Sequence, residues 1–450
     1  MTDSRKQKLI DLGAATLADA LLKLAVHSDE ADDLIEQLIA TSEENTHRFK
    51  KKLSSLKHSK RFISWKKSAS FARELTMLLQ DVKAGTDDPL TGIKLIAEFY
   101  EADNAIFEMC DDSSGNIGDV FRYDAKELFV DYASRCMEKE KIADIILQVN
   151  KKDNYGIRNT LIECAGECLP EAVIRTMIST LQKWADKQSD EYGRCHYLMM
   201  IESLARQIKD AELFEKTSIT SRGKLSTAAL IDIAEVYLES GDTETAHARL
   251  KKIPKGETYQ AYKRNKLLEE IYRKQGNSKQ LSELLYQRFR SCHSTDTLQE
   301  LLEVIGSDKR SKVIADEVAH IMNRGSIRES DAEFLIAIGK IDEAEVYLLK
   351  HADHLDGNLY SSLPALAEVM EAENRYLVTS LIYRKLLLSI LERGHTRAYP
   401  HGIRYLKKLD KLSAFVTDWK NFNHHEAFKE QIFQTHGLKR SFWSKYDGKK

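Results

Sequence analysis

The chain has 450 residues, of which 42% are hydrophobic and 31% are charged, and its 68 Lys and Arg against 70 Asp and Glu give a formal net charge of −2. This composition supports a sizeable core and excludes a disordered or collagen-like chain, and the near-neutral charge excludes a polyanion-seeking field over the whole molecule. No stretch reaches 18 apolar residues and the six cysteines are scattered, so we expect a cytoplasmic protein with reduced thiols and no membrane association.

Helical periodicity dominates the chain from its beginning. Near the N-terminus, apolar residues recur at helical spacing at Leu9, Leu12, Leu17, Leu21 and Leu24. Strand-like alternation is nearly absent, and only 5 Pro and 20 Gly are available for turns. We therefore predict an all-α fold with an N-terminal helical region over residues 1–215 and helical repeats with a C-terminal helical cap over residues 216–450.

Two segments of opposite charge follow each other near the N-terminus. Residues 29–44 include seven acids and no Lys or Arg, whereas residues 48–67 include nine Lys or Arg and no acid, interleaved with Phe49, Phe62 and Trp65. Basic residues with aromatics suit a groove that follows a nucleic-acid backbone. The alternative is that the two segments face each other or are simply solvated. The candidate basic surface consists of Lys50, Lys51, Lys52, Lys60, Arg61, Lys66 and Lys67.

The acidic stretch 111–119 suggests a calcium loop at first sight. However, neither Asp111 nor Asp112 as the first position puts Gly at position six and Glu at position twelve, as an EF-hand requires. We therefore expect a structural turn that ends in a helix cap at Asp119.

A second candidate for metal binding involves cysteine. Cys164 and Cys168 lie one helical turn apart, and the pair Cys195 and His196 would complete a set of four zinc ligands. The spacing is not that of a zinc finger or ribbon, and free cysteine is among the most buried residue types. We expect buried thiols, no metal and no other cofactor.

The second half of the chain repeats itself. The apolar pattern around Gly241 recurs 35 residues later around Gly276, and the pattern around Gly339 recurs 35 residues later around Asn374. Gly306 lies between these pairs at an irregular spacing. A Gly or Asn at such a position can adopt the left-handed conformation that ends a helix. Each position therefore predicts a turn between two helices.

A small residue five positions after the turn, Ala246 or Ala344, lets the second helix pack closely, although Leu281 breaks this rule. The pattern resembles degenerate tetratricopeptide repeats over about residues 225–390, without their opening Trp or closing Pro. Such units need stacked neighbours to bury their faces, so we predict an α-solenoid of tetratricopeptide-like helical hairpins after an irregular N-terminal helical half. An irregular helical bundle is the alternative.

The segment 393–404 is the densest in functional side chains. It surrounds a turn between helices, where Pro400 opens the next helix and free amides can bind an anion. The candidates for binding an anion or a partner are Arg393, His395, Arg397, Tyr399, His401 and Arg404. The alternative is a hydrogen-bonded corner that locks the last repeats. Helical ribonucleases place four to six residues between Arg and His, whereas here seven or three residues intervene.

Several segments together resemble a bacterial family of helical-repeat proteins of unknown function, namely residues 12–18, 61–65, 111–121, 398–406 and 439–443. The resemblance spans nearly the whole chain. Relatives of its C-terminal part are similar to segments that accompany SWIM zinc-finger domains, which implies a partner acting near nucleic acid. This chain has no SWIM-type Cys/His cluster.

Signatures of common enzyme sites are missing from the sequence. It contains no G-x-x-x-x-G-K-[ST], G-x-G-x-x-G, H-E-x-x-H or G-x-S-x-G motif. We expect a non-enzymatic protein–protein interaction scaffold whose concave face holds a partner protein or peptide. The alternatives are a nucleic-acid-binding or nucleic-acid-processing accessory factor in a bacterial defence or regulatory system, and an enzyme without a known motif.

Overall fold

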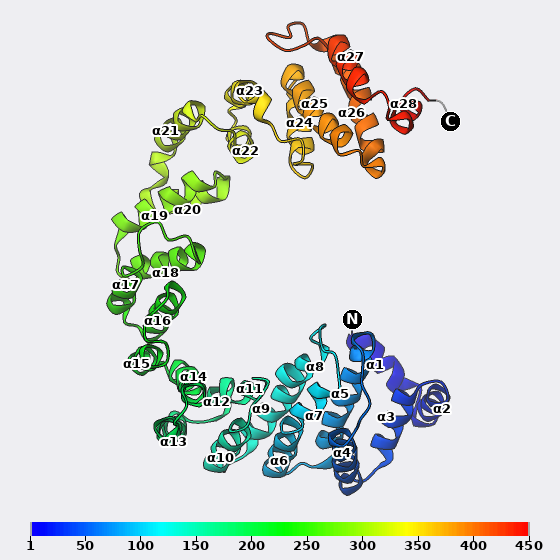
Figure 1. Ribbon diagram of the computed structural model, residues 1–450, viewed down its shortest axis with the longest axis vertical. Helices are drawn as coiled ribbons and strands as arrows, with labels where there is room; N and C mark the ends of the chain where they lie inside the picture. Colours follow the sequence, from blue (N-terminus) through cyan, green and yellow to red (C-terminus); the bar gives the residue numbers. More distant parts are fainter. Residues whose placement is uncertain (1, 449–450) are drawn as a thin grey trace. The chain divides into compact units, whose positions relative to one another are not determined.

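Figure 1 shows the computed structural model of the chain, which describes residues 2–448 without the side chains of residues 2, 3, 29 and 30. Every regular element in that range is helical, which confirms the predicted all-α fold, and the one pairing of strand type there joins Ile63 and Cys110. The chain divides into two compact units, residues 1–267 and 268–450. The predicted boundary near residue 215 rests on a change of sequence pattern rather than on compactness, and it stays a prediction.

The first unit is built from short helices joined by tight turns. Its elements are α1 (Thr2–Asp11), α2 (Ala14–Ala25), α3 (Asp29–Ile39), α4 (Ser42–Lys57), the 3₁₀ turn η1 (Trp65–Lys67), α5 (Ser68–Gly85), α6 (Pro89–Tyr100), α7 (Asp103–Glu108), α8 (Asn116–Asp119), the π-helical η2 (Val120–Ala125), α9 (Lys126–Arg135), α10 (Lys139–Asn150), α11 (Asn159–Glu163), α12 (Ala165–Cys168), α13 (Glu171–Lys187), α14 (Glu191–Gln207), α15 (Ala211–Arg222), α16 (Thr227–Ser240), α17 (Thr243–Leu250) and α18 (Ala261–Lys274), which continues into the second unit. One apolar core extends from Phe49 on α4 to Leu204 on α14.

The second unit follows the same plan. Its elements are α19 (Ser278–Ser291), α20 (Thr295–Ile305), the 3₁₀ turn η3 (Ser307–Lys309), α21 (Arg310–Asn323), α22 (Glu329–Ala337), α23 (Ile341–Lys350), the 3₁₀ turn η4 (Ala352–His354), α24 (Leu363–Ala372), α25 (Tyr376–Arg393), the 3₁₀ turn η5 (Thr396–Ala398), α26 (Tyr399–Leu412), the 3₁₀ turn η6 (Ser413–Phe415), α27 (His425–His436) and α28 (Arg440–Tyr446). Its core extends from Leu281 on α19 to Trp443 on α28.

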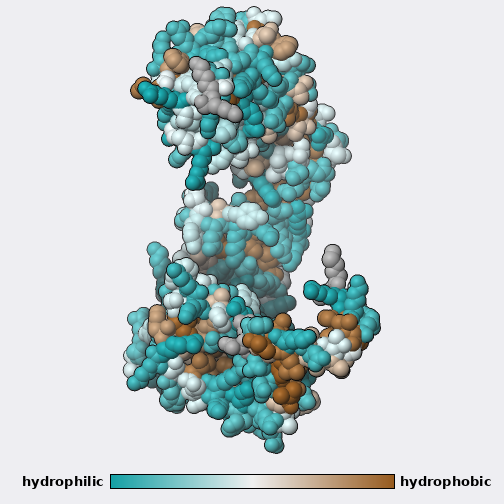
Figure 2. Space-filling view, turned by 90° about the vertical axis from the view of Figure 1, so that its right-hand side faces the viewer, coloured by the Kyte–Doolittle hydropathy of each residue, from teal (hydrophilic) through white to brown (hydrophobic). Residues whose placement is uncertain are grey.

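Helix α2 is packed less completely than the rest of the first unit. None of its side chains is buried, and Leu22 and Leu24 are 58% and 60% exposed. Figure 2 shows apolar surface of the first unit that is open to solvent. Because burying a leucine contributes about 1.5–3 kcal/mol, α2 draws little stability from the core of its unit.

The acidic stretch 111–119 is a structural turn, but its cap is not the predicted one. Asp112, not Asp119, binds the amides at the start of α8, with its carboxylate oxygens accepting from Ile117 and Gly118 at 2.9 Å each. Asp119 is the last residue of α8, and the chain continues directly into η2. The prediction was wrong because the free amides belong to the helix that starts at Asn116, three residues before the proposed cap.

The four turns predicted from the repeat pattern lie where we expected them. Gly241 separates α16 from α17, Gly276 separates α18 from α19, Gly339 separates α22 from α23, and Asn374 separates α24 from α25. Their φ angles are 95°, 64°, 79° and 57°, all in the left-handed region. The prediction of these turns is confirmed.

The same pair of backbone hydrogen bonds closes each of these turns. At the first, the amide of Gly241 donates to Leu238 at 3.2 Å, and the amide of Asp242 reaches back to the carbonyl of Tyr237 at 2.9 Å. Equivalent pairs close the turns at 276, 339 and 374. These bonds satisfy carbonyls that the end of a helix would otherwise leave unpaired.

A fifth turn of this kind lies outside the predicted repeat region. Lys209, between α14 and α15, has a φ of 57°, and the amides of Lys209 and Asp210 donate to Arg206 and Ala205 at 3.0 and 2.9 Å. Asp210 then caps α15 by accepting from the amide of Leu213. The hairpin geometry therefore begins before residue 215.

A buried charge network joins helices of the second unit. Nδ1 of His293 lies 2.6 Å from Asp331, and its Nε2 lies 3.0 Å from Glu317. Each carboxylate also pairs with an arginine, Asp331 with Arg324 at 2.7 Å and Glu317 with Arg290 at 3.1 Å. Burial lowers the pKa of His293, but the hydrogen bonds to the two carboxylates outweigh it and raise that pKa overall. Both ring nitrogens therefore face carboxylates, an arrangement that favours the protonated ring.

Candidate anion-binding site

The predicted functional segment forms a corner between two helices of the second unit. Helix α25 ends at Gly394, whose φ of 67° turns the chain out of the helix. The 3₁₀ turn η5 follows, and α26 begins with Pro400 in its first turn and without a side-chain cap. The fixed φ of proline suits this position, where its missing amide costs no hydrogen bond.

The corner encloses a pocket of about 570 Å³. Four of the predicted residues line it, namely Arg393, His395, Arg397 and His401. The other lining residues are Gly357, Tyr360, Leu386, Ile390, Thr396, Ala398 and Tyr405. The volume lies in the range of small-ligand and side-chain pockets, and the lining combines positive groups with an apolar floor.

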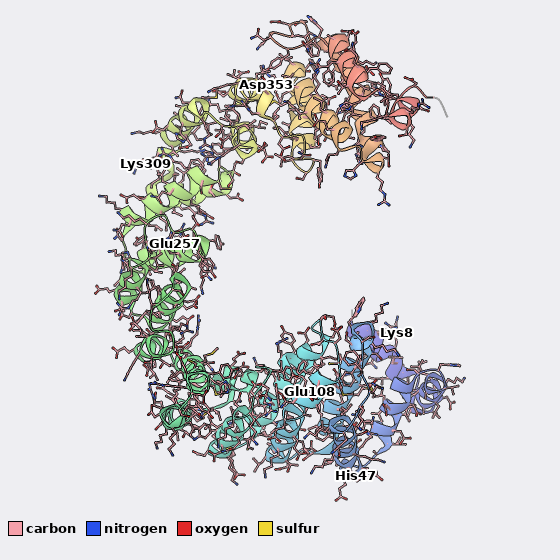
Figure 3. All side chains as sticks on the ribbon, in the orientation of Figure 1. Lys8, His47, Glu108, Glu257, Lys309 and Asp353 are labelled. Carbon is pink, nitrogen blue, oxygen red and sulfur yellow. The ribbon has the colours of Figure 1, made fainter. Side chains whose placement is uncertain are left out.

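The far wall of the pocket comes from the turn before α24. In Figure 3 the labelled Asp353 marks η4, just before this turn. Lys385 on α25 donates to the carbonyl of Asp353 at 2.8 Å, and Ser389 donates to the side chain of Asn358 at 2.9 Å. A Cβ on Gly357 would stand 2.1 Å from the carbonyl oxygen of Lys385, so only glycine allows this approach. The turn is thereby fixed against α25.

The positive charge of the pocket is not neutralised within the described part of the chain. No acid is among the lining residues. Arg393 donates to the carbonyl of Ser389 at 3.2 Å and lies 5.8 Å from the ring centroid of Tyr360, while Arg397 is exposed and makes no hydrogen bond or ion pair with a described residue. Uncompensated guanidinium groups at an apolar pocket favour a carboxylate or a phosphate.

Two of the six predicted residues lie outside the pocket lining. Arg404 is 3.1 Å from Nδ1 of His401 and 5.8 Å from the ring centroid of Tyr405, so it supports the wall. Tyr399 is buried and packs edge-on against Phe442, with ring centroids 5.5 Å apart. Tyr399 therefore contributes to the core.

The pocket residues outside the segment 393–404 were not among the predicted site residues. The helical periodicity of α25 could have indicated Leu386 and Ile390, because it places them on the same face as Arg393. Tyr360 and Gly357 carry no such signal, because only the packing of their turn against α25 brings them to the corner.

The predicted basic surface divides between paired and unpaired side chains. Lys52 pairs with Asp33 of the acidic segment at 2.8 Å, and Arg61 pairs more loosely with Glu74 at 3.6 Å. The side chains of Asp29 and Glu30, which open the acidic segment, lie outside the described residues. The remaining members are exposed and form no ion pair with a described residue: Lys50, Lys51, Lys60, Lys66 and Lys67. The acidic segment therefore accounts for only part of this surface.

The thiols and the imidazole considered as zinc ligands have other contacts. Cys164 and Cys168 are buried, and burial raises their pKa to about 12 and about 11. Sγ of Cys195 lies 3.7 Å from the carbonyl of Ser221, and His196 contacts the carbonyl of Asn150. Across the described residues, no group of three or more His, Cys, Asp or Glu is placed to hold a metal ion.

Of the helices that the structure describes, none combines the length and the apolar character of a membrane-spanning segment.

Comparison with known proteins adds one result about the chain as a whole. The search against curated proteins gives no match. The sequence matches the model of the "Family of unknown function (DUF6880)" over residues 3–445, in agreement with the predicted resemblance to an uncharacterised family. The chain therefore belongs to the DUF6880 family of unknown function.

Proposed function

We propose that this protein is a non-enzymatic scaffold that holds an acidic segment of a partner protein in the pocket between α25 and α26. The observation that carries the proposal is the placement of Arg393 and Arg397 at an apolar pocket with no acid in its lining. The fold gains no ion pair from either arginine, whereas an anionic partner would bind both.

The lining favours a peptide over a free inorganic anion. Leu386 and Ile390 form an apolar floor, and Tyr360 and Tyr405 add ring surface. If a carboxylate of the ligand binds Arg393 and Arg397, the apolar floor remains available to an adjacent apolar side chain of the same ligand. The preferred ligand is therefore an Asp or Glu next to a large apolar residue.

A tetratricopeptide-like solenoid is part of this proposal. The shared turn geometry at Gly241, Gly276, Gly339 and Asn374 supports it, since stacked hairpins create the concave faces on which repeat proteins bind partners. The similarity of the C-terminal part to segments that accompany SWIM zinc fingers would fit a partner acting near nucleic acid. A cytoplasmic location is also proposed, in keeping with six unpaired cysteines.

A binding role fits the pocket better than catalysis. Neither His395 nor His401 hydrogen-bonds to a carboxylate of the described residues, and Nδ1 of His401 instead faces Arg404. A general base of the usual kind is oriented by a third group, and a ribonuclease would need such an imidazole beside its arginine. We therefore propose no reaction at this site.

A fluorescence-polarisation titration of the full chain tests the proposal. The probe is a pool of fluorescein-labelled octapeptides with one Asp or Glu beside one Leu or Tyr, and the matched pool has Asn or Gln in place of the acid. We expect saturable binding of the acidic pool and binding of the amide pool weaker by about tenfold or more, because charge-assisted hydrogen bonds contribute about 1.5–3 kcal/mol.

Substitutions then locate the binding. Arg393→Gln with Arg397→Gln should abolish the preference for the acidic pool. Arg310→Gln, an exposed arginine at the start of α21, is the matched control and should leave binding unchanged. Equal binding of both pools, or displacement of the acidic pool by an equal concentration of inorganic phosphate, would contradict the proposal.

A further inference from the structure

The segment that joins α4 to α5 is fixed to the core of the first unit by one residue. The amide of Ile63 donates to the carbonyl of Met109 at 2.8 Å, and the amide of Asp111 donates to the carbonyl of Ile63 at 2.9 Å. Ile63 is only 3% exposed. In Figure 3 the labelled Glu108 marks the end of α7, next to Met109. The backbone on both sides of Ile63 is thereby held in place.

Two aromatic side chains on either side of Ile63 are exposed. Phe62 is 69% exposed and Trp65 is 56% exposed. Phe62 lines a hollow of about 420 Å³ together with Arg61, Lys67, Glu74 and the buried Phe71. Because the segment is already ordered, a ligand that stacks on these rings would lose less free energy to ordering the protein.

The same segment is rich in positive charge. Lys60, Lys66 and Lys67 form no ion pair with a described residue, and Nζ of Lys66 lies 5.7 Å from the ring centroid of Trp65. Arg61 has one loose partner, Glu74, at 3.6 Å, and both side chains are more than half exposed. An ion pair of this kind contributes little and is easily exchanged.

The nearest acids on the opposite strand of the bridge are engaged in their own loop. Asp112 accepts from the amides of Ile117 and Gly118, where the amino end of α8 offsets its charge. Asp111 accepts hydrogen bonds from the amide and the hydroxyl of Ser113. These carboxylates are therefore not partners of the lysines.

We propose that residues 60–67 form a binding site for single-stranded nucleic acid. Unpaired bases would stack on Phe62 and Trp65, and Lys60, Lys66 and Lys67 would contact the phosphates. A duplex hides its base faces, and an acidic peptide has no planar groups that require two exposed rings. This site lies in the first unit and is independent of the pocket in the second, so either proposal can fail alone.

The test measures binding of 5′-fluorescein-labelled dT12 to the full chain by fluorescence polarisation. Phe62→Ala and Trp65→Ala should each weaken binding by about fivefold or more, because stacking contributes about 1–3 kcal/mol per base. Tyr192→Ala, which removes another exposed ring of the first unit, is the matched control and should have no effect. Lys66→Gln with Lys67→Gln should reduce the salt dependence of binding.

A loss of binding in these variants can be distinguished from a loss of folding. Both aromatic side chains are exposed, so their removal should leave the thermal midpoint of unfolding unchanged. No saturable binding of dT12 at 50 mM salt would overturn the proposal. So would affinity that is unaffected by Phe62→Ala and Trp65→Ala, or wild-type binding of a duplex or a poly-Glu peptide as tight as that of dT12.

Discussion

The protonation of His293 contributes to the stability of the fold. Its pKa is raised in the folded protein, whereas the pKa values of Asp331 and Glu317 are lowered because their hydrogen bonds to the imidazolium and their arginine partners outweigh burial. A histidine whose pKa is raised by folding contributes its full stabilisation at pH values below its unfolded-state pKa of about 6.5. This contribution is lost as the pH rises through the pKa of the folded state. The lowered carboxylate pKa values contribute above about pH 4 and lose their effect at lower pH.

These signs predict a window of greatest stabilisation. His293→Gln should lower the thermal midpoint most between about pH 4.5 and 6.5, and the difference from wild type should shrink as pH rises further. Removing one partner of a buried ion pair costs about 3–5 kcal/mol. Scanning calorimetry of both proteins across pH is the measurement, with the exposed His354→Gln as the control. A difference that is independent of pH would show that folding does not raise the pKa of His293, and a difference that grows as pH rises would show that the ring is held neutral.

From individual residues, the sequence predicted the arginines and histidines of the candidate site but not the rest of its lining. Arg393, His395, Arg397 and His401 lie within nine residues of one another, so chain connectivity alone keeps them close. Tyr360 could not be predicted, because it reaches the pocket through the fit of Gly357 against α25, a tertiary contact. The contacts of Arg404 likewise depend on packing.

Turns with a left-handed residue connect several helix pairs of this fold, and these residues contribute to its stability. A Cβ on Gly241 would meet no other atom within 4 Å, so a substitution there acts only through the positive φ. Gly241→Val should cost about 1 kcal/mol or more in the free energy of unfolding. Gly325→Val is the control, because that glycine has equally open surroundings without a positive φ. Equal urea midpoints for the two variants would contradict the left-handed turn.

The turn at Lys209 predicts a stabilising substitution. A lysine in the left-handed region is strained, so Lys209→Gly should raise the free energy of unfolding by about 0.5–1 kcal/mol. Lys216→Gly, in the interior of α15, should instead lower it by about 1 kcal/mol. Urea unfolding measures both. Destabilisation by Lys209→Gly would show that the turn differs from that at Gly241.

Turns between helices could be predicted where the residue at the turn was itself a Gly or an Asn. Gly and Asn marked four turns, but Lys209 gave no such mark, so the hairpin there was missed. The following residue did carry a usable signal, because Asp210, Asp242 and Asn277 all cap the next helix. A search for a capping residue after a helical run, rather than for glycine alone, would have found it.

For the whole molecule, the formal net charge of −2 means that anion binding has to be local. The two proposed sites are accordingly small, and each is built on a fixed element of the fold. Helical periodicity was sufficient to predict the all-α class, because it recurs in nearly every segment. The division near residue 267 was not predictable, because the sequence is helical on both sides of it.

We propose that the arginines of the pocket serve a ligand rather than the fold. Thermal unfolding of the wild type and of the Arg393→Gln and Arg397→Gln double variant, each with and without the acidic peptide pool, tests it most directly. We predict nearly equal midpoints without peptide, since neither arginine forms an ion pair with a described residue and Arg393 makes only one hydrogen bond and one ring contact. On adding peptide, we predict a rise for the wild type alone. A midpoint lowered by several degrees in the variant without peptide, together with equal rises for both proteins, would contradict the account.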